Sequence, residues 1–392
     1  MNIIIICDAV TDFLAGSFIS ALRFAEILSK KHKVVFISSK YPNMPDINYY
    51  KGIKIYRLFA FPVPKTKGKL YLSFPNCSKV KKILKKEKAD LVHIMIPSPL
   101  GFSAIKAARA LNLKVVAHSH TQPENWGPYI PGIFSKEKLF GFAYRYIISI
   151  YNRADIVICP SRFSAGILKS KGLKVKTKVI SNGVDAAKFR RVKYSKGDLK
   201  RFGLSENTKK LLFVGRIDPE KNIDLIIKSV PLIERKFKNF EICIVGEGIK
   251  KDYLENFAKQ LGVSGKVKFL GRVSDKDLIK AYSLSDIFIL PSLVELEGMV
   301  VLEAMACSLP ILVAKSKDSA ASQFVNNNGF LFNPKSANDL AKKCVKLLKN
   351  SRLLKKMAVK SYKNSKEYHI AKSIRSIEEV YYNLVHNRKV LK

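Results

Sequence analysis

The sequence is short of acidic side chains, of tryptophan and of cysteine. Its 392 residues include 31 Asp and Glu against 71 Lys and Arg, with one tryptophan and six cysteines. The cysteines lie far apart and none forms a C-x-x-C pair, so neither a metal site nor a disulfide framework is predicted. Most of them sit in apolar runs, and we therefore expect buried free thiols in a reducing compartment.

Long apolar runs are also missing. No stretch of about 18 apolar residues occurs, so no transmembrane helix is expected. Residues 1–7 are apolar but lack a basic start and meet Asp8 at once, which favours a first strand over a signal peptide. A hydrophobic content of 47% still allows a sizeable core, and the length suggests two domains.

The excess of positive charge is extreme, with a formal net charge of +40. Such a charge indicates anionic partners and says nothing about the fold. Nucleic acid, anionic lipid and a lysine-rich proteome are all compatible with it. A basic nucleic-acid-binding protein is therefore an alternative, but the chain has no recognisable nucleic-acid module and the charge is spread through both halves, so we expect no nucleic-acid partner.

Strand and helix patterns alternate in two successive series. The first begins with a strand over 2–7, a helix over 18–28 and a strand over 34–38, an order typical of a parallel α/β unit. The second restarts with a strand over 210–214. The residues between the two series, 188–206, are polar and basic, which is typical of a linker.

The stretch 290–306, LPSLVELEGMVVLEAMA, predicts a strand end, a turn and a helix that begins near Gly298. A glycine there lets a ligand approach the backbone, and the free N–H groups of the first helical turn favour an anion. Glu295 lies in the turn and Glu303 in the helix. Because carboxylates repel an anion, we expect both to bind neutral hydroxyls. An anion with hydroxyls on either side describes a sugar nucleotide.

The segment 295–306, ELEGMVVLEAMA, resembles the carboxyl-terminal signature of the retaining family 4 glycosyltransferases, E-x-F-G-x-x-x-x-E-A-M-A. Glu297 takes the place of the aromatic residue, and Ser308 stands where a glycine is usual. Further matches follow the family in register: the loop GRIDPEKN at 215–222, the turn NGVD at 182–185, His120-Thr121 at a strand end, and a degraded glycine loop at 15–17.

The resemblance implies an α/β fold of the GT-B type, with two facing Rossmann-like domains and a central cleft. It assigns residues 1–187 to an acceptor-binding domain and 188–206 to a linker. Residues 207–365 would bind the nucleotide sugar, and 366–392 would form a helix that crosses back to the first domain.

The resemblance also implies a set of site residues. His120 and Glu295 would be the catalytic pair, with His120 near the reacting carbon and Glu295 on the sugar hydroxyls. The donor would be held by Gly16, Arg216, Lys221, Val273, Gly298, Met299, Val300 and Glu303. Gly16 is equally compatible with a plain turn glycine, and His120 with a surface loop. No metal and no cofactor are expected beyond the nucleotide sugar, a UDP-sugar or another nucleoside-diphosphate sugar, as substrate.

The implied reaction moves a hexose from a nucleoside diphosphate to an acceptor with retention and without a protein nucleophile. The His-Thr-Gln-Pro-Glu run from His120 is most similar to the diacylglycerol glycosyltransferase branch, so a lipid acceptor is predicted. A polyprenyl-linked or soluble saccharide is the alternative acceptor.

Two segments predict contact with an anionic membrane. Residues 65–88 combine lysines with aromatic rings and prolines, and residues 126–153 interleave aromatic rings with Lys and Arg, a composition suited to the interface. We therefore expect a cytoplasmic enzyme, peripheral on the cytoplasmic face of the membrane. The alternative is that Phe140, Tyr144 and Ile147, which share helical spacing, are simply core.

Overall fold

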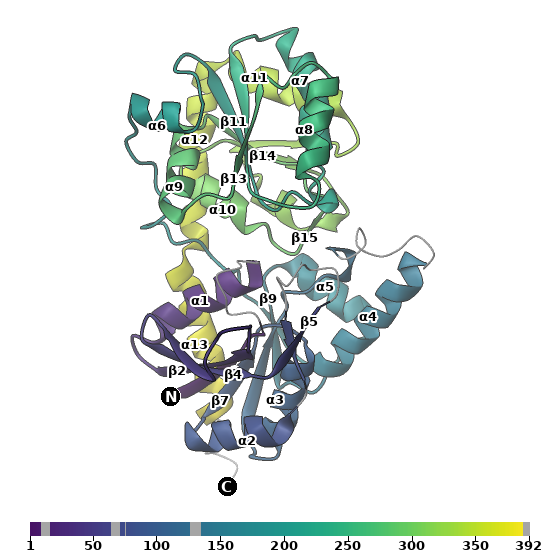
Figure 1. The fold of residues 1–392 in the computed structure, drawn as a ribbon, viewed down its shortest axis with the longest axis vertical. Helices are drawn as coiled ribbons and strands as arrows, with labels where there is room; N and C mark the ends of the chain where they lie inside the picture. The colour runs from purple at the N-terminus through teal and green to yellow at the C-terminus, as the bar shows by residue number, and fades with distance from the viewer. Residues whose placement is uncertain (9–15, 64–70, 75, 126–134, 387–392) are drawn as a thin grey trace. The chain divides into compact units, whose positions relative to one another are not determined.

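The computed structural model describes residues 1–8, 16–63, 71–74, 76–125 and 135–386 (Figure 1). The chain divides into two compact units. The first consists of Met1–Pro123, Pro131–Asn182 and Lys372–Lys392, and the second of Glu124–Ile130 and Gly183–Ala371. Each unit has its own parallel sheet and its own hydrophobic core.

The sheet of the first unit has eight strands in the order β10-β9-β8-β7-β1-β2-β4-β3. All neighbours are parallel except β3 and β4, and a separate antiparallel pair is formed by β5 and β6. The strands are β1 (Asn2–Ile6), β2 (Lys33–Ser39), β3 (Ile47–Tyr50), β4 (Ile53–Leu58), β5 (Ala60–Pro62), β6 (Tyr71–Ser73), β7 (Leu91–Ile94), β8 (Lys114–His118), β9 (Ile156–Cys159) and β10 (Thr177–Val179).

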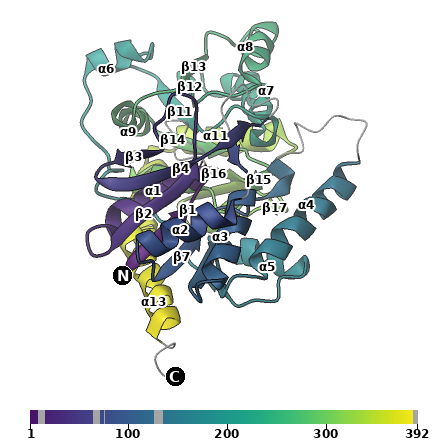
Figure 2. The ribbon, with the colours of Figure 1, turned by 60° about the horizontal axis from the view of Figure 1, so that its bottom comes forward.

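Helices cover both faces of this sheet. In β1, Ile4 and Ile6 join the core cluster that contains residues of α2 and α3, while Ile3 and Ile5 on the opposite face are equally inaccessible. A strand buried on both faces is expected to be apolar at every position, as β1 is. Helices α2 and α3 lie side by side (Figure 2). The helices are α1 (Gly16–Leu28), α2 (Cys77–Lys86), α3 (Pro99–Arg109), α4 (Lys136–Tyr151), α5 (Arg162–Ser170) and most of α13 (Ile370–His386).

The second unit has six parallel strands in the order β13-β12-β11-β14-β16-β18, and a short parallel pair, β15 and β17. Its central strands are largely apolar because both faces are covered; every residue of Phe240–Val245 is buried, and Glu241 is the one charged residue among them. The strands are β11 (Lys209–Val214), β12 (Phe240–Val245), β13 (Val267–Gly271), β14 (Ile287–Leu290), β15 (Val294–Glu295), β16 (Ile311–Ala314), β17 (Asp318–Ser319) and β18 (Gly329–Phe332).

The helices of the second unit form two layers. Helix α7 packs against α8 and α11, whereas α10 packs against α12. Figure 1 shows α7 and α8 on one side of the sheet and α9 on the other. The helices are α6 (Lys196–Arg201), α7 (Ile223–Glu234), α8 (Lys251–Gln260), α9 (Asp275–Leu284), α10 (Met299–Ala306), α11 (Ala337–Leu348) and α12 (Ser351–Ser365), with 3-10 turns η2 (Pro219–Lys221), η3 (Ala321–Phe324) and η4 (Lys366–Tyr368).

Residues 188–206, for which we expected a linker, pack onto the second unit. They include helix α6, and Leu199, Phe202 and Leu204 belong to the core of that unit. The segment was interpreted as a linker because its overall composition is polar and basic. Its three apolar side chains are nevertheless spaced so that one face of the short helix and the turn after it can be buried.

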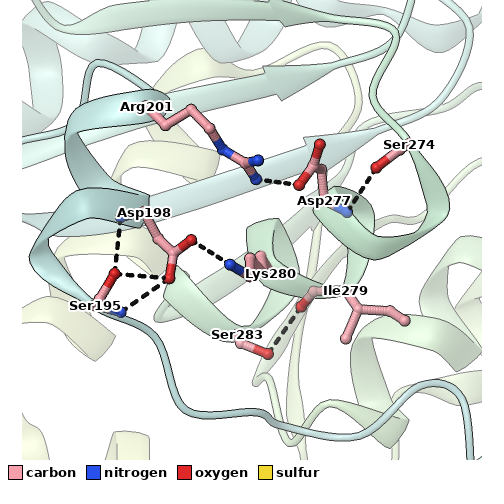
Figure 3. A network of polar contacts seen from close by, with 8 residues as sticks. All are labelled: Ser195, Asp198, Arg201, Ser274, Asp277, Ile279, Lys280 and Ser283. Atoms are coloured by element: carbon pink, nitrogen blue, oxygen red, sulfur yellow. Dashed lines mark hydrogen bonds and ion pairs between the residues drawn. The ribbon is translucent and has the colours of Figure 1, made fainter.

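Polar contacts fasten α6 to α9 (Figure 3). Ser195 and Asp198 form a capping box at the start of α6. Asp198 then pairs with Lys280, and Arg201 pairs with Asp277, both from α9. The two ion pairs cross between elements far apart in sequence, so they fix the position of α6 on its own unit.

None of the helices described between residues 16 and 386 combines the length and the apolar character needed to cross a membrane.

Candidate active site

The candidate donor site lies where the strand order of the second sheet reverses. Strand β11 has β12 on one side and β14 on the other, and the chain runs outward from it in both directions. Ligands of open parallel sheets bind beside the carboxyl ends of the strands at such a switch point. The loops after β11 and β14 carry Arg216, Lys221, Glu295 and Gly298, so four of the predicted donor and catalytic residues start from this place.

Two buried carboxylates bind the guanidinium of Arg216. One terminal nitrogen donates to Asp218, and Nη2 donates to Glu220 Oε1 at 2.6 Å. The side chains of Asp218 and Glu220 are 4% and 3% exposed, whereas that of Arg216 is 44% exposed. The cation is therefore oriented by buried anions while part of it faces the solvent side of the loop. The sequence motif did not identify Asp218 and Glu220 as its anchors.

The same loop is tied to the loop after β14. The Leu293 N–H donates to the Glu220 carbonyl oxygen at 2.8 Å. Asn222, in the left-handed region with φ 53°, donates from Nδ2 to the carbonyl of Pro334 at 3.0 Å. Burial raises the pKa of the Glu220 carboxyl, and the charges of Arg216 and Lys221 counteract part of that rise. These bonds give the loop one defined position.

Lys221 and Glu295 form a direct ion pair. Lys221 Nζ lies 2.7 Å from Glu295 Oε1, and the two side chains are 12% and 17% exposed. Screening by salt is weak for a pair this well shielded. The contact brings together the residue predicted for the diphosphate and the residue predicted for the sugar.

The helix start that the sequence predicted near Gly298 is confirmed, because α10 begins at Met299. Gly298 has φ 97°, and a Cβ added there would lie 3.1 Å from Ala321 Cβ. The N-cap of α10 is Gly298, which has no side chain to cap the helix, and the helix begins at Met299. The Glu295 carbonyl accepts from Ala320 N–H at 2.8 Å, and this bond joins the turn to the segment after β17. The first turn of α10, with Met299 and Val300, thus starts a few residues after Glu295 in the sequence.

Ser308, at the position where the family has glycine, is also in the left-handed region, with φ 60°. It follows α10 directly, and its N–H donates to the Met305 carbonyl at 3.0 Å. A non-glycine residue held in this conformation costs about 1 kcal/mol or more. The family's usual glycine at this position is therefore explained by the left-handed backbone conformation, which Ser308 also adopts.

Glu303 is buried, with 5% of its surface exposed. Its Oε2 accepts from the hydroxyl of Tyr282 in α9 at 3.1 Å. Glu297, in the aromatic place of the motif, is also buried, and its charge adds to burial in raising the pKa of the Tyr368 hydroxyl. Neither tyrosine was found from the sequence, because no family motif includes it and its spacing to the glutamates is not local.

Val273, predicted near the nucleobase, follows β13 and is partly buried against the core. The neighbouring loop explains the G-x-G at 246–248. A Cβ on Gly246 would lie 1.9 Å from the Gly215 carbonyl oxygen, and one on Gly248 would lie 2.3 Å from the Ile217 carbonyl oxygen. The two glycines let this loop lie directly against the backbone of the loop that carries Arg216.

His120 and Gly16 lie in the first unit, apart in the chain from the donor-site residues. Gly16 is the first residue of α1, and the predicted glycine loop before it, 9–15, falls outside the described residues. His120 follows β8, is partly exposed and has an Nε2 atom shielded from solvent. Burial lowers the pKa of its imidazole to about 3, so the ring is neutral at neutral pH.

A cavity of about 730 Å³ opens in the second unit next to these loops. None of the predicted donor or catalytic residues lines it, although their neighbours Asn222 and Leu293 do. Among the residues that the structure describes, no group of three or more His, Cys, Asp or Glu side chains is placed to hold a metal ion.

Both halves of the chain match known protein families. The family described as "Glycosyl transferases group 1" matches residues 196–366, and the "Glycosyltransferase Family 4" matches residues 15–188. The alpha-monoglucosyldiacylglycerol synthase of Streptococcus pneumoniae is 27% identical over 317 residues, 80% of this chain and 70% of that protein. The enzyme of the same name from Acholeplasma laidlawii is 22% identical over 411 residues and covered in full, as is this chain.

Solved structures have the same fold. The sucrose-phosphate synthase of Thermosynechococcus elongatus superimposes with a TM-score of 0.82 at 18% identity, over 99% of this chain and 100% of that one. HepE of Anabaena in complex with UDP-glucose gives a TM-score of 0.76 at 20% identity, over 97% and 99%. The α/β fold of two Rossmann-like units, predicted from the sequence, is confirmed. The chain belongs to the glycosyltransferases of the GT-B fold described by these two families, is related to their glycolipid synthases, and is an enzyme of the hexosyltransferase type.

Proposed function

We propose that this enzyme transfers a hexose from a nucleoside-diphosphate sugar to a lipid acceptor of the diacylglycerol type, with retention of the anomeric configuration. The observation that carries the donor part is the arrangement after β11 and β14 of the second sheet: Arg216 is held by two buried carboxylates, Lys221 pairs with Glu295, and α10 begins shortly after Glu295 in the chain. It offers cations, backbone N–H groups and a carboxylate to a ligand that is anionic in one part and hydroxylated in another.

In the proposed donor complex, Arg216 and Lys221 bind the diphosphate. Arg216 is already oriented by Asp218 and Glu220, so little reorganisation is needed when negative charge grows on the leaving group. The N–H groups of Gly298, Met299 and Val300 approach the same phosphates, and the family resemblance assigns Gly16 to the donor as well. Each charge-assisted contact contributes roughly 1.5–3 kcal/mol.

The two glutamates bind hydroxyls in this proposal. Glu303, buried beside Tyr282, accepts from the ribose, and Val273 lies against the base. Glu295 accepts from the sugar hydroxyls while Lys221 keeps its charge neutralised. His120 contacts the sugar near the reacting carbon. A neutral imidazole both donates and accepts a hydrogen bond, which suits a hydroxylated ligand.

The chemical step needs no protein nucleophile. The bond from the anomeric carbon to the β-phosphate oxygen breaks while the acceptor oxygen bonds to that carbon on the same face. The acceptor proton passes to an oxygen of the departing diphosphate, so charge and atoms balance without a metal or a cofactor in the proposal. The protein then acts by holding the reactants and stabilising the leaving group.

The lipid acceptor is supported by two of the relatives, which are named as diacylglycerol glycolipid synthases. A surface of the first unit suits it. Helix α4 buries Tyr144 and Ile147 on one face, while Phe142 and Tyr146 are 64% and 42% exposed on the other. The alternative that this helix contributes to the core is therefore correct for Tyr144 and Ile147. The exposed rings of Phe142 and Tyr146 are available for contact with a membrane interface.

The test is a donor and acceptor screen with the full chain. UDP-, GDP- and ADP-hexoses are offered with diacylglycerol in mixed vesicles, with polyprenyl phosphate, or with soluble saccharides, and glycosylated products are identified by mass. We expect one donor to give a glycolipid with diacylglycerol or its monoglycosyl form. A product on soluble saccharide alone would replace the lipid acceptor, and failure with every nucleotide sugar would overturn the donor assignment.

A further inference from the structure

Three histidines of the first unit form a stacked column. The ring centroids of His93 and His118 are 5.5 Å apart at an interplanar angle of 15°, and those of His118 and His120 are 4.3 Å apart at 18°. Phe24 of α1 stacks on His118 at 5.6 Å. His93 and His118 come from the adjacent strands β7 and β8, so the sheet itself sets their spacing. His120 is the partly exposed end of the column.

Helix α13 supplies the other end. The hydroxyl of Tyr381 lies 2.5 Å from His93 Nδ1, and the tyrosine ring meets the imidazole edge-on at 5.7 Å. Tyr381 is fully buried, and burial raises the pKa of its hydroxyl, which therefore stays protonated. Because the hydroxyl can donate, His93 is expected to accept at Nδ1 and to carry its proton on Nε2.

The column is electrically neutral. Burial lowers the pKa of His93 to about 3 and that of His118 well below its ordinary value, and the neighbouring imidazoles lower both further. No described residue offers a hydrogen-bond partner to either ring nitrogen of His118 or to Nε2 of His93. A phenyl ring would stack there without leaving polar atoms unpaired, so packing alone does not account for the imidazoles.

We propose that Tyr381 and His93 are positioning residues for His120. The hydroxyl of Tyr381 selects the tautomer of His93 and fixes the orientation of its ring. Because the rings of His93, His118 and His120 are stacked, the orientation of His93 constrains that of His118, which in turn constrains that of His120. The C-terminal helix would then set the orientation of an imidazole that contacts the donor sugar. This inference rests on the proposed role of His120.

The variant Tyr381→Phe removes one oxygen and keeps the ring. Its control is Tyr382→Phe, the same change at the next residue of α13, where the side chain is 44% exposed. We expect Tyr381→Phe to lower kcat about three- to tenfold with the donor KM unchanged, and Tyr382→Phe to leave both as in the wild type. A merely structural role would change the thermal midpoint without this split.

A double-mutant cycle tests the route through His120. If Tyr381 acts through that ring, Tyr381→Phe has no further effect on kcat in a His120→Ala background. Additive losses would overturn the proposal. If the wild type turns over no nucleotide sugar at all, the proposed function fails instead, and the two failures are thereby distinguished.

Nitrogen NMR of the imidazoles reads the tautomers without any assay of activity. We expect neutral His93 with its proton on Nε2 in the wild type and a mixture of tautomers in Tyr381→Phe. A wild-type His93 protonated on Nδ1, or charged at neutral pH, would overturn the proposal even where the variant does not fold.

Discussion

Lys221 Nζ and Glu295 Oε1 lie 2.7 Å apart, so the loop after β11 and the turn after β14 are joined by a shielded ion pair. One partner is predicted to bind phosphate and the other to bind sugar hydroxyls. A donor that occupies both positions must share or replace this contact. The pair keeps each side chain from being a lone charge in a poorly solvated place before the ligand arrives.

Removal of either donor-site cation should lower transfer. Arg216→Ala or Lys221→Ala is expected to reduce kcat/KM at least about tenfold, since a lost contact of about 1.4 kcal/mol gives that factor. Steady-state kinetics over the donor concentration provide the measurement. The matched control is Arg235→Ala, an exposed arginine at the end of α7. Wild-type turnover in both variants would contradict the assignment.

Substitution of Gly298 tests the turn before α10. Alanine there must adopt φ 97° with its Cβ 3.1 Å from Ala321 Cβ. We expect a loss of about 1–3 kcal/mol in the free energy of unfolding and a raised donor KM. Gly265→Ala is the control, because its added Cβ meets no atom within 4 Å and its φ is outside the left-handed region. Equal behaviour of the two variants in denaturant titrations and kinetics would refute this reading.

The stereochemistry of the product tests the mechanism independently of any mutant. The anomeric configuration of the transferred sugar should match that of the donor, as measured by proton NMR of the early product. Retention is expected because the leaving diphosphate and the incoming oxygen share one face of the sugar. An inverted product would exclude the proposed same-face step.

Membrane docking predicts a specific pair of side chains. The double variant Phe142→Ala with Tyr146→Ala should bind vesicles containing anionic lipid about fivefold less, because roughly 1 kcal/mol of apolar contact is lost. The control is Val359→Ala with Tyr362→Ala on α12, where the side chains are 71% and 42% exposed. Co-sedimentation at low and high salt gives the answer. Binding that depends on neither lipid charge nor salt concentration would contradict the proposal that this surface docks to an anionic membrane.

Asp8 should make stability depend on pH. It is fully buried at the end of β1, where it accepts from Ser39 Oγ at 3.3 Å and from the hydroxyl of Ser98. Burial raises its pKa from 3.8 to about 6 despite these bonds. Between those values the folded chain binds more protons than the unfolded chain. The stability contributed by this group is thus present below about pH 4 and lost as pH rises through about 6.

The loss amounts to at most about 3 kcal/mol, from 1.36 kcal/mol per pKa unit. The free energy of unfolding of the wild type minus that of Asp8→Asn should therefore decrease between pH 4 and pH 7. The difference cancels the opposite contribution of the buried histidines, which are common to both proteins. Parallel stability curves would show that Asp8 does not titrate in this range.

Much of the fold followed from local patterns. The four-residue strand Ile287–Leu290 and the glycine before α10 were readable because an apolar run, a turn and a helix start are encoded next to one another. Helix α2 was missed, because only Val80, Ile83 and Leu84 are buried in it and its lysines were assigned to the predicted membrane-contact segment 65–88. Helix α6 was missed because it lies in a polar and basic segment that was assigned to a linker.

The site could be predicted only as far as motifs reach. Arg216 and Lys221 were assigned to the donor site by their place between a strand and a helix. Their partners came from elsewhere: Glu295 is distant in sequence from Lys221, and Tyr282 from Glu303. The contact of His93 with Tyr381 joins residues 288 positions apart, and no local rule predicts it. Such pairings depend on tertiary packing, which a single sequence does not encode locally.

The assignment of residues 372–392 to the first unit has a consequence for synthesis on the ribosome. The second unit has all its strands and core residues by Ala371, whereas the first still lacks Ile374, Ile377 and Tyr381, which are buried. The half that is begun first is therefore finished last. Until α13 emerges, the nascent first unit lacks these buried side chains and exposes the surface that they cover, so chaperones that recognise exposed apolar surface should bind it during that interval.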